Sequence, residues 1–484
     1  MLHISVNELL QVTGAQLIAG SPEHAVTGCV IDSREVKPGA LFVAFPGEHV
    51  DGNTYVAKAL QAGAACAVVT RKPNQDALDI ARRGGCAIVQ AANGDPEEFM
   101  LRLATWWRNQ HPDWLVCGVT GSVGKTTTKN MTAAAFGAKF HTHATKGNFN
   151  NLIGVPLTLF AAPDDAQALV VEMGMNHKGE IRRLAAAVRP TVAIITNIGT
   201  SHIGNLGSRE NIARAKGEIL SGMRPTAQAF HKIAPCLVLN ATDDYADFIA
   251  KTFARPAGVE VVYVDGDKGC VQAHDITLNN QGYARFTLEF ADGWKRQVSL
   301  HIPGRHAVAD ALCALAISER CHVDREEAVL AITQLQGEQM RLQVKTAPGK
   351  AQVIDDTYNA SPASEAEALD VLNHMSCSGR KIVVLGEMGE LGSEARKLHG
   401  YVGAYAAAIH PAMLVTIGHD LAHCIAEAAE TMGLSEDSIV SFDDVDSALK
   451  VIKPILKPED LVLVKASRAE RLDRFVEGVL QQCR

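Results

Sequence analysis

The strongest constraint on the fold is a series of short, continuous apolar runs separated by stretches with helical periodicity. Four of these runs lie in the middle of the chain: WLVCGV, ALVVEMG, TVAIITNIG and CLVLN. Short runs that are apolar at successive positions are typical of parallel strands buried on both faces, with helices crossing between them. We therefore predict an α/β fold built around a mostly parallel sheet.

The chain has 484 residues, too many for one hydrophobic core, and we predict three domains. Residues 1–95 alternate short apolar runs with helical stretches and form a small α/β domain. Residues 96–336 begin with a helix, continue through the four runs above, and end in alternating segments with turns at NNQG and ADG, which predict antiparallel hairpins. In residues 337–484 the runs QVIDD, KIVVLG, AMLVTIG and LVLVKAS predict a doubly wound, Rossmann-like domain.

Net charge, apolar stretches and cysteine spacing exclude several classes of binding partner and cofactor. A formal net charge of -8 argues against nucleic acid or an anionic membrane as the main partner. No stretch approaches the ~20 apolar residues of a membrane span, and the N-terminus lacks the pattern of a signal peptide. The eleven cysteines show no C-x-x-C spacing, which predicts reduced thiols in a cytosolic protein and argues against zinc.

A glycine-rich loop follows the first of the four apolar runs. Residues 119–130 read VTGSVGKTTTKN, with Val119 where a strict Walker A motif has its first glycine. The chemistry of a phosphate site is still present, because glycines and a helix N-terminus favour anions. We expect Lys125 to reach the β- and γ-phosphates and Thr126 to hold Mg²⁺.

Three further residues are candidates for metal chemistry. Glu172 ends the run ALVVEMG and His202 follows TVAIIT, so both belong to the edge where α/β sheets bind ligands. We expect Glu172 to serve as a second metal ligand, in the position that a Walker B carboxylate usually occupies. On the residues alone, His202 is as readily structural as a ligand, and Lys216 reads more simply as a solvated lysine on a helix. The string IDDTYNASP is equally compatible with a binding site and with loop polarity.

Taken together, these strings resemble the Mur ligase family of ATP-dependent, amide-forming enzymes of peptidoglycan precursor synthesis. The resemblance covers essentially the whole chain and rests on TGSVGKTTT, THATKGNFNNLIGVPLT, VEMGMNHKGEI, TNIGTSHIGNLGSRENIARAKGEIL, IPGRHAVADALCALA, IDDTYNASP and GEMGELG. Within the family, DDTYNASP and GEMGELG look most like the member that joins D-alanyl-D-alanine to UDP-N-acetylmuramoyl-tripeptide.

The resemblance implies a mechanism with ATP and two Mg²⁺ ions. The tripeptide carboxylate attacks the γ-phosphate to give an acyl phosphate, and the amine of the dipeptide then displaces phosphate. Lys125, Glu172, His202 and Lys216 are the implied catalytic residues, with Thr126, Glu172, His202 and a carbamylated Lys216 as metal ligands. The implied ATP-binding residues are Thr120, Gly121, Ser122, Val123, Gly124, Lys125, Thr126, Thr127, Asp310, Arg341 and Asp356. The implied substrate-binding residues are Ser33, Arg34, Asn148, Asn150, Asn151, Tyr358 and Asn359.

One helix departs from the family pattern. Two asparagines usual in the family are replaced here by Ala307 and Asp310. An ionised aspartate accepts from the adenine amino group but cannot donate to a ring nitrogen. We therefore expect a weak preference for ATP over GTP.

Two alternatives remain open at this stage: a sister ligase that adds a single amino acid, and a non-catalytic nucleotide-binding partner. The family leads us to expect a monomer in the bacterial cytoplasm, with no nucleic-acid or membrane partner. Three domains around a cleft also predict an open form that closes on its ligands.

Overall fold

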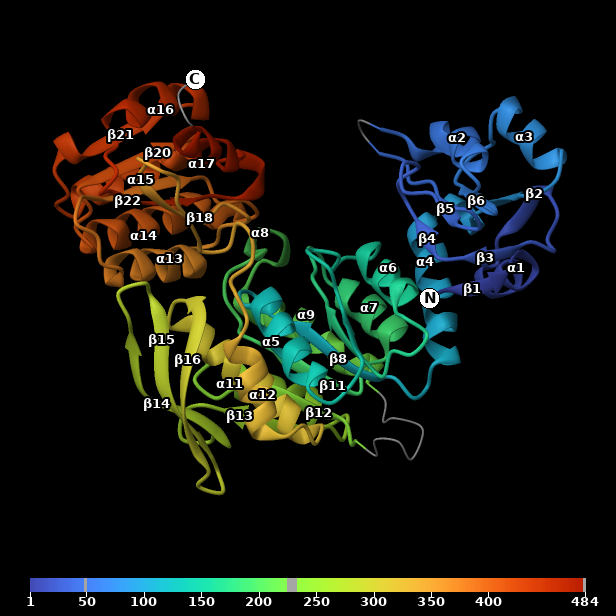
Figure 1. Cartoon of the computed structure of the whole chain (residues 1–484), viewed down its shortest axis with the longest axis horizontal. Coiled ribbons are helices and arrows are strands. Elements are labelled where there is room, and N and C mark those ends of the chain that lie inside the picture. The colour runs from blue at the N-terminus through green and yellow to red at the C-terminus, as the bar shows by residue number, and fades with distance from the viewer. Residues whose placement is uncertain (48–49, 224–232, 482–484) are drawn as a thin grey trace.

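The computed structural model describes residues 1–47, 50–223 and 233–481 of the chain. Figure 1 shows three α/β domains, with the N-terminal and C-terminal domains on different sides of the central one. The fold class predicted from the sequence is confirmed. No helix in the described ranges is long and apolar enough to cross a membrane.

The N-terminal domain is built on a five-stranded sheet in the order β2-β7-β6-β5-β4, in which only β2 is antiparallel. A two-stranded antiparallel ribbon, β1 with β3, lies beside it. The strands are β1 (His3–Ser5), β2 (Gln16–Gly20), β3 (Ala25–Thr27), β4 (Cys29–Val30), β5 (Leu41–Val43), β6 (Cys66–Val69) and β7 (Ala87–Gln90). The α-helices are α1 (Val6–Thr13), α2 (Val56–Gln61), α3 (Gln75–Arg82) and α4 (Pro96–Gln110).

The central domain carries a nine-stranded sheet in the order β16-β15-β14-β13-β12-β11-β8-β10-β9. Its strands are β8 (Leu115–Thr120), β9 (Thr142–Ala144), β10 (Ala168–Glu172), β11 (Val192–Ile195), β12 (Cys236–Asn240), β13 (Glu260–Val264), β14 (Val271–Leu278), β15 (Tyr283–Phe290) and β16 (Lys295–Pro303). Its α-helices are α5 (Lys125–Gly137), α6 (Gly154–Ala161), α7 (Glu180–Val188), α8 (Ile203–Leu206), α9 (Arg209–Gly217), α10 (Ala246–Ile249), α11 (His306–Arg320) and α12 (Arg325–Thr333).

The predicted change from parallel to antiparallel pairing is confirmed at β14, since β14, β15 and β16 form two antiparallel hairpins. The parallel part is buried on both faces. Leu115, Cys117 and Val119 of β8 belong to the core on the side of α5 and α11, whereas Val116 belongs to the core that includes α4 and α7. This double burial explains why the strands read as unbroken apolar runs.

The C-terminal domain has a six-stranded sheet in the order β17-β18-β22-β19-β20-β21, parallel except for β17. The strands are β17 (Gln343–Lys345), β18 (Gln352–Asp356), β19 (Lys381–Gly386), β20 (Met413–Ile417), β21 (Ile439–Phe442) and β22 (Leu461–Lys465). The α-helices are α13 (Pro362–His374), α14 (Ala395–Ala408), α15 (Asp420–Thr431), α16 (Val445–Ile452) and α17 (Asp473–Leu480).

The register of the strands determines where the candidate residues lie at the ends of the two sheets. Glu172 pairs with Val119 and Ile195 pairs with Thr120, so β8, β10 and β11 end together and the loops after them meet at one edge. In the C-terminal sheet, Asp356 and Lys465 are register partners at the ends of β18 and β22. The carboxyl ends of parallel strands are where open α/β sheets bind ligands.

Candidate active site between the central and C-terminal domains

The glycine loop connects β8 to α5 and is held by Asn197. The Val123 amide donates to the Asn197 side-chain oxygen at 3.0 Å, and the Ser122 amide donates to the Asn197 carbonyl at 3.0 Å. Gly124 has a φ of 79°, and a Cβ there would lie 2.4 Å from Oδ1 of Asp310. Glycine is therefore required at this position both by backbone conformation and by the close approach of a side chain.

Two lysines meet beneath the loop. Lys125 donates to the carbonyl oxygens of Gly121 and Ser122 at 2.9 and 3.1 Å, and Lys216 donates to the Gly121 carbonyl at 2.7 Å. Burial lowers the pKa of Lys125, and nearby Glu172 opposes that shift. Burial, followed by the charge of Lys125, holds the pKa of Lys216 well below its ordinary value. Burial thus disfavours the charged form of the Lys216 amine, which is not the solvated lysine on a helix that the sequence suggested.

Glu172 presents an unpaired oxygen to the cavity. The side chain is 1% exposed; Oε1 accepts from the Asn150 amide at 2.8 Å, and Oε2 is buried without a hydrogen-bond partner. Thr126, also buried, lies in the same cavity lining. A carboxylate oxygen and a hydroxyl are oxygen donors of the kind that Mg²⁺ prefers, so these residues fit one magnesium ion.

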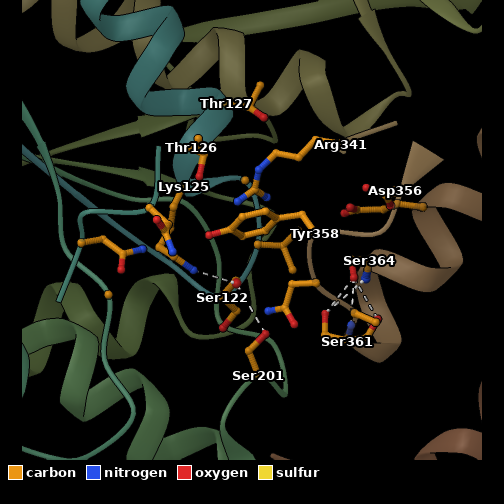
Figure 2. Close-up of a pocket in the computed structure, with 18 of the residues that line it drawn as sticks. Ser122, Lys125, Thr126, Thr127, Ser201, Arg341, Asp356, Tyr358, Ser361 and Ser364 are labelled. Atoms are coloured by element: carbon orange, nitrogen blue, oxygen red, sulfur yellow. Dashed lines mark hydrogen bonds between the residues drawn. The ribbon is translucent and has the colours of Figure 1, made fainter. Parts of the chain in front are cut away.

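The C-terminal domain supplies the opposite wall. The Arg341 guanidinium lies 4.2 Å from the centre of the Tyr358 ring, and Figure 2 shows both side chains reaching toward Lys125 and Thr126. Asp356 accepts from Lys465 at 2.6 Å and from the Leu342 amide at 3.1 Å. Lys465 is 1% exposed and anchors Asp356.

His202 contacts a residue that the sequence reasoning did not select. Its Nδ1 lies 2.5 Å from Oε2 of Glu390, a residue of the GEMGELG string in the C-terminal domain. This contact, ahead of other effects, lowers the pKa of Glu390. The string contributes to the family resemblance, but nothing local in it indicates that its second glutamate reaches the central domain.

Most of the predicted residues line one cavity between the two domains. These are Ser122, Val123, Gly124, Lys125, Thr126, Thr127, Asn148, Asn150, Glu172, His202, Arg341, Asp356, Tyr358 and Asn359. Ser361, Ser364, Ser201 and His306 complete parts of the wall without having been predicted. Figure 2 shows Ser361 and Ser364 at the start of α13 on the side of Asp356.

Other predicted residues lie outside this lining. Asp310 faces an adjoining cavity that also borders Val123 and Gly124. Thr120 ends β8 as a buried residue, while Gly121 and Lys216 lie behind the loop. Asn151 accepts from the Gly154 amide at 2.8 Å and so caps the start of α6. Ser33 and Arg34 lie in the N-terminal domain, where exposed Arg34 pairs with Asp32.

The second predicted metal site is less complete than the first. Among the described residues, no group of three or more His, Cys, Asp and Glu side chains is arranged to hold a metal ion. His202 and an unmodified Lys216 provide only nitrogen atoms, whereas Mg²⁺ prefers oxygen ligands. A second magnesium ion therefore depends on conversion of Lys216 into an oxygen ligand.

Comparisons with known proteins agree with this geometry. Family models match residues 25–100 (Mur ligase family, catalytic domain), 119–318 (Mur ligase middle domain) and 340–468 (Mur ligase, glutamate ligase domain). The UDP-N-acetylmuramoyl-tripeptide--D-alanyl-D-alanine ligase of Bacillus subtilis (strain 168) is 32% identical, with 99% of each chain covered.

Solved structures give the same result. A crystal structure of MurF from Acinetobacter baumannii superimposes with a TM-score of 0.84 at 29% identity, covering 100% of both chains. The MurF ligase from Thermotoga maritima in complex with ADP has a TM-score of 0.75 at 25% identity, covering 94% of this chain and 97% of that one. By sequence and by structure, this chain belongs to the Mur ligase family.

Proposed function

We propose that this chain is an ATP-dependent ligase that joins D-alanyl-D-alanine to UDP-N-acetylmuramoyl-tripeptide, giving the pentapeptide precursor of peptidoglycan. The observation that carries the proposal is the cavity in which a phosphate loop and Glu172 face Arg341, Asp356 and Tyr358 across two domains. Full-length relatives named for this reaction support the choice of substrates.

In the first step, a tripeptide carboxylate oxygen bonds to the γ-phosphorus of ATP as the bond to ADP breaks. Lys125 and Arg341 line the cavity and can neutralise the transferring phosphoryl group. Lys125 reaches the phosphates by leaving the Gly121 carbonyl. Thr126 and Glu172 would hold Mg²⁺, which would supply further charge neutralisation for the phosphoryl transfer.

In the second step, the dipeptide amine attacks the carbonyl carbon of the acyl phosphate, phosphate leaves, and the amine loses a proton. A free carboxylate is a poor acylating agent, and phosphorylation supplies the leaving group. Because the amine must meet a carbonyl held among Asn148, Asn150 and Tyr358, the domains contribute mainly orientation and exclusion of water. We propose that Ser33 and Arg34 hold the UDP end of the substrate.

The adjoining cavity, of about 410 Å³, suits the nucleoside part of ATP. It borders Val123 and Gly124 on one side, and Asn240, Thr242 and Asp310 also line it. A nucleoside there leaves the phosphates over the glycine loop. Asp310 is then the residue of this chain that we assign to the base.

We also propose that CO₂ converts Lys216 into a carbamate. Carbamylation requires a neutral amine, and burial next to Lys125 favours one. The product is an anionic oxygen group, the kind of ligand that a second Mg²⁺ beside His202 lacks. We further propose a monomer working in the bacterial cytoplasm, where ATP and nucleotide-linked precursors are available.

Phosphate release tests the function. The full chain is incubated with ATP, Mg²⁺, UDP-N-acetylmuramoyl-tripeptide and D-alanyl-D-alanine, with controls that omit one component each. Release that requires all of them, with formation of the pentapeptide product, supports the proposal. Release with a single amino acid in place of the dipeptide favours a sister ligase, and no release under any condition favours a non-catalytic nucleotide-binding protein.

A further inference from the structure

The loop that carries Glu390 is a braced part of the C-terminal domain. It spans residues 386–392, after β19. The Met388 amide donates to Nε2 of the buried His399 at 2.8 Å, and the Ser467 amide donates to the Glu387 carbonyl at 3.0 Å. The Glu387 carboxylate in turn accepts from the His419 amide at 2.8 Å. These contacts fix the loop to its own domain, so Glu390 moves with that domain.

The same loop touches α8 of the central domain backbone to backbone. The Gly204 amide donates to the Glu390 carbonyl at 2.9 Å. A Cβ on Gly204 would lie 2.6 Å from the Gly392 amide nitrogen, and a Cβ on Gly392 would lie 2.7 Å from Cα of Gly204. Such an approach leaves no space for side chains at either position. The two loops are shaped to fit each other when the domains lie as they do here.

His202 and Glu390 face each other beside this glycine contact. Both have a φ of 63°, an unusual conformation for residues other than glycine. The imidazole is mostly buried, with 17% of its side chain exposed, and it borders the active-site cavity. Its Nδ1 is within ion-pair distance of the Glu390 carboxylate but makes no hydrogen bond of regular geometry with the described residues. Sparsely populated backbone conformations persist where the surroundings enforce them, and they cluster at functional sites.

We propose that Glu390 is a positioning residue that acts through His202: with the C-terminal domain seated on α8, its carboxylate holds the imidazole proton on Nδ1. Nε2 then carries no proton and can act as a ligand or acceptor in the cavity. Carboxylates commonly orient ligating histidines in this way. Because Glu390 belongs to the other domain, the imidazole is set for catalysis only after closure, which couples phosphoryl transfer to domain docking.

The meaning of this inference for catalysis rests on the proposed function, but the proton position can be measured without the dipeptide. We would label the full chain with ¹⁵N-histidine and record two-bond ¹H–¹⁵N correlations with and without Mg-ADP, at a pH where free imidazole is neutral. The His202 signals are those that disappear in His202→Asn. In the wild type we expect the His202 proton on Nδ1 in at least one of the two spectra, with or without Mg-ADP. In Glu390→Ala we expect this Nδ1–H form of His202 to be absent.

Kinetics provide the second readout. We expect Glu390→Ala to lower kcat by about 10–100-fold, the usual effect of losing a residue that orients a ligand, with a nearly unchanged KM for ATP. Glu390→Gln should recover part of the rate, because its amide oxygen can accept from Nδ1–H. The matched control is Glu394→Gln, an exposed glutamate paired with Lys397, which should change neither readout.

Two results would overturn the inference: an Nε2–H imidazole in both wild-type spectra, or a Glu390→Ala protein with wild-type spectra and kcat. Glu390 is 43% exposed, so its truncation should leave the fold intact. If the wild type instead fails to use D-alanyl-D-alanine while the Nδ1–H signal is present and depends on Glu390, the proposed function fails and the positioning contact stands.

Discussion

Lys125 and Lys216 share a single acceptor, the carbonyl oxygen of Gly121, which receives hydrogen bonds of 2.9 and 2.7 Å. Two ammonium groups at one buried oxygen repel each other, and the charge of Lys125 is one cause of the lowered pKa of Lys216. Lys125 can therefore serve phosphate as a cation, whereas burial and the charge of Lys125 favour a neutral, reactive amine at Lys216 of α9.

Lys216 should carry a carbamate. In the presence of ¹³C-bicarbonate, the wild-type chain should show a carbamate carbon signal that Lys216→Ala lacks, and Lys216→Ala should lose at least about 100-fold in kcat. The control is Lys251→Ala, an exposed lysine that should leave both signal and rate unchanged. Near-full turnover by Lys216→Ala would refute this role.

Glu172→Gln should raise the Mg²⁺ concentration needed for half-maximal activity by at least about tenfold and lower kcat. Glutamine keeps an oxygen for the Asn150 amide but removes the negative charge from the unpaired oxygen. A Mg²⁺ titration of initial rates measures both effects. An unchanged Mg²⁺ requirement would remove Glu172 from the metal site.

Nucleotide choice should depend on pH through Asp310. Burial raises the pKa of this carboxyl to about 7, with Thr128 donating to Oδ1 at 2.8 Å, His306 opposing the shift and Glu367 adding to it. Below that pH the protonated acid can donate to a ring nitrogen, and above it the acid can only accept. The ATP-to-GTP ratio of kcat/KM should thus fall from pH 6 to pH 8.

Asp310→Asn is the matched variant for this measurement, since the amide donates and accepts at every pH. It should prefer ATP more strongly than the wild type, with a ratio that does not change across the same range. Strong and pH-independent discrimination by the wild type would show that other groups read the base.

The buried carboxyl group of Glu365 should lower the free energy of unfolding at alkaline pH. It is buried, neither carboxylate oxygen has a hydrogen-bond partner, and burial raises its pKa from 4.5 to about 8 despite Lys465. A raised pKa in the folded state means that its contribution is fully present below about pH 4.5 and is lost as pH rises through about 8.

Glu365→Met should therefore be more stable than the wild type by about 1–3 kcal/mol at pH 8, because an unpaired buried polar group is removed. Urea unfolding at pH 5 and pH 8 measures the free energy of unfolding. Glu365→Gln should flatten the difference between the two pH values. Equal pH dependence in wild type and Glu365→Gln would count against this account.

The sequence was sufficient to predict the parallel strands of the sheets and the local motifs. The apolar runs predicted the parallel strands because burial on both faces leaves a direct mark on composition, and the glycine loop predicted the start of α5 at Lys125. Very short elements such as β4 and β17 leave too few residues for a pattern. One of the helical stretches of residues 1–95, GNTYVAKALQAGA, begins as a 3₁₀ turn and becomes α2 only at Val56.

Contacts between residues far apart in the sequence could not be predicted in this way. Glu390 and His202 are 188 positions apart, and Lys465 and Asp356 are 109 apart. No local period encodes such pairs; they follow from the register of the sheets and from docking of the domains. For the same reason, burial at the centre of the site explains why Lys216 differs from an ordinary lysine on a helix.

Main-chain contacts form part of the docking surface between the central and C-terminal domains. Besides the Gly204–Glu390 contact, the Ser376 amide donates to the Asn280 carbonyl at 3.0 Å, and Gly282 packs against Val371 and Met375. These main-chain contacts tolerate substitution nearby, because most exchanges of neighbouring side chains leave the path of the backbone unchanged. These main-chain contacts also offer few side chains for a small molecule to bind. An inhibitor of domain closure therefore has more groups to bind in the polar cavity than at these contacts.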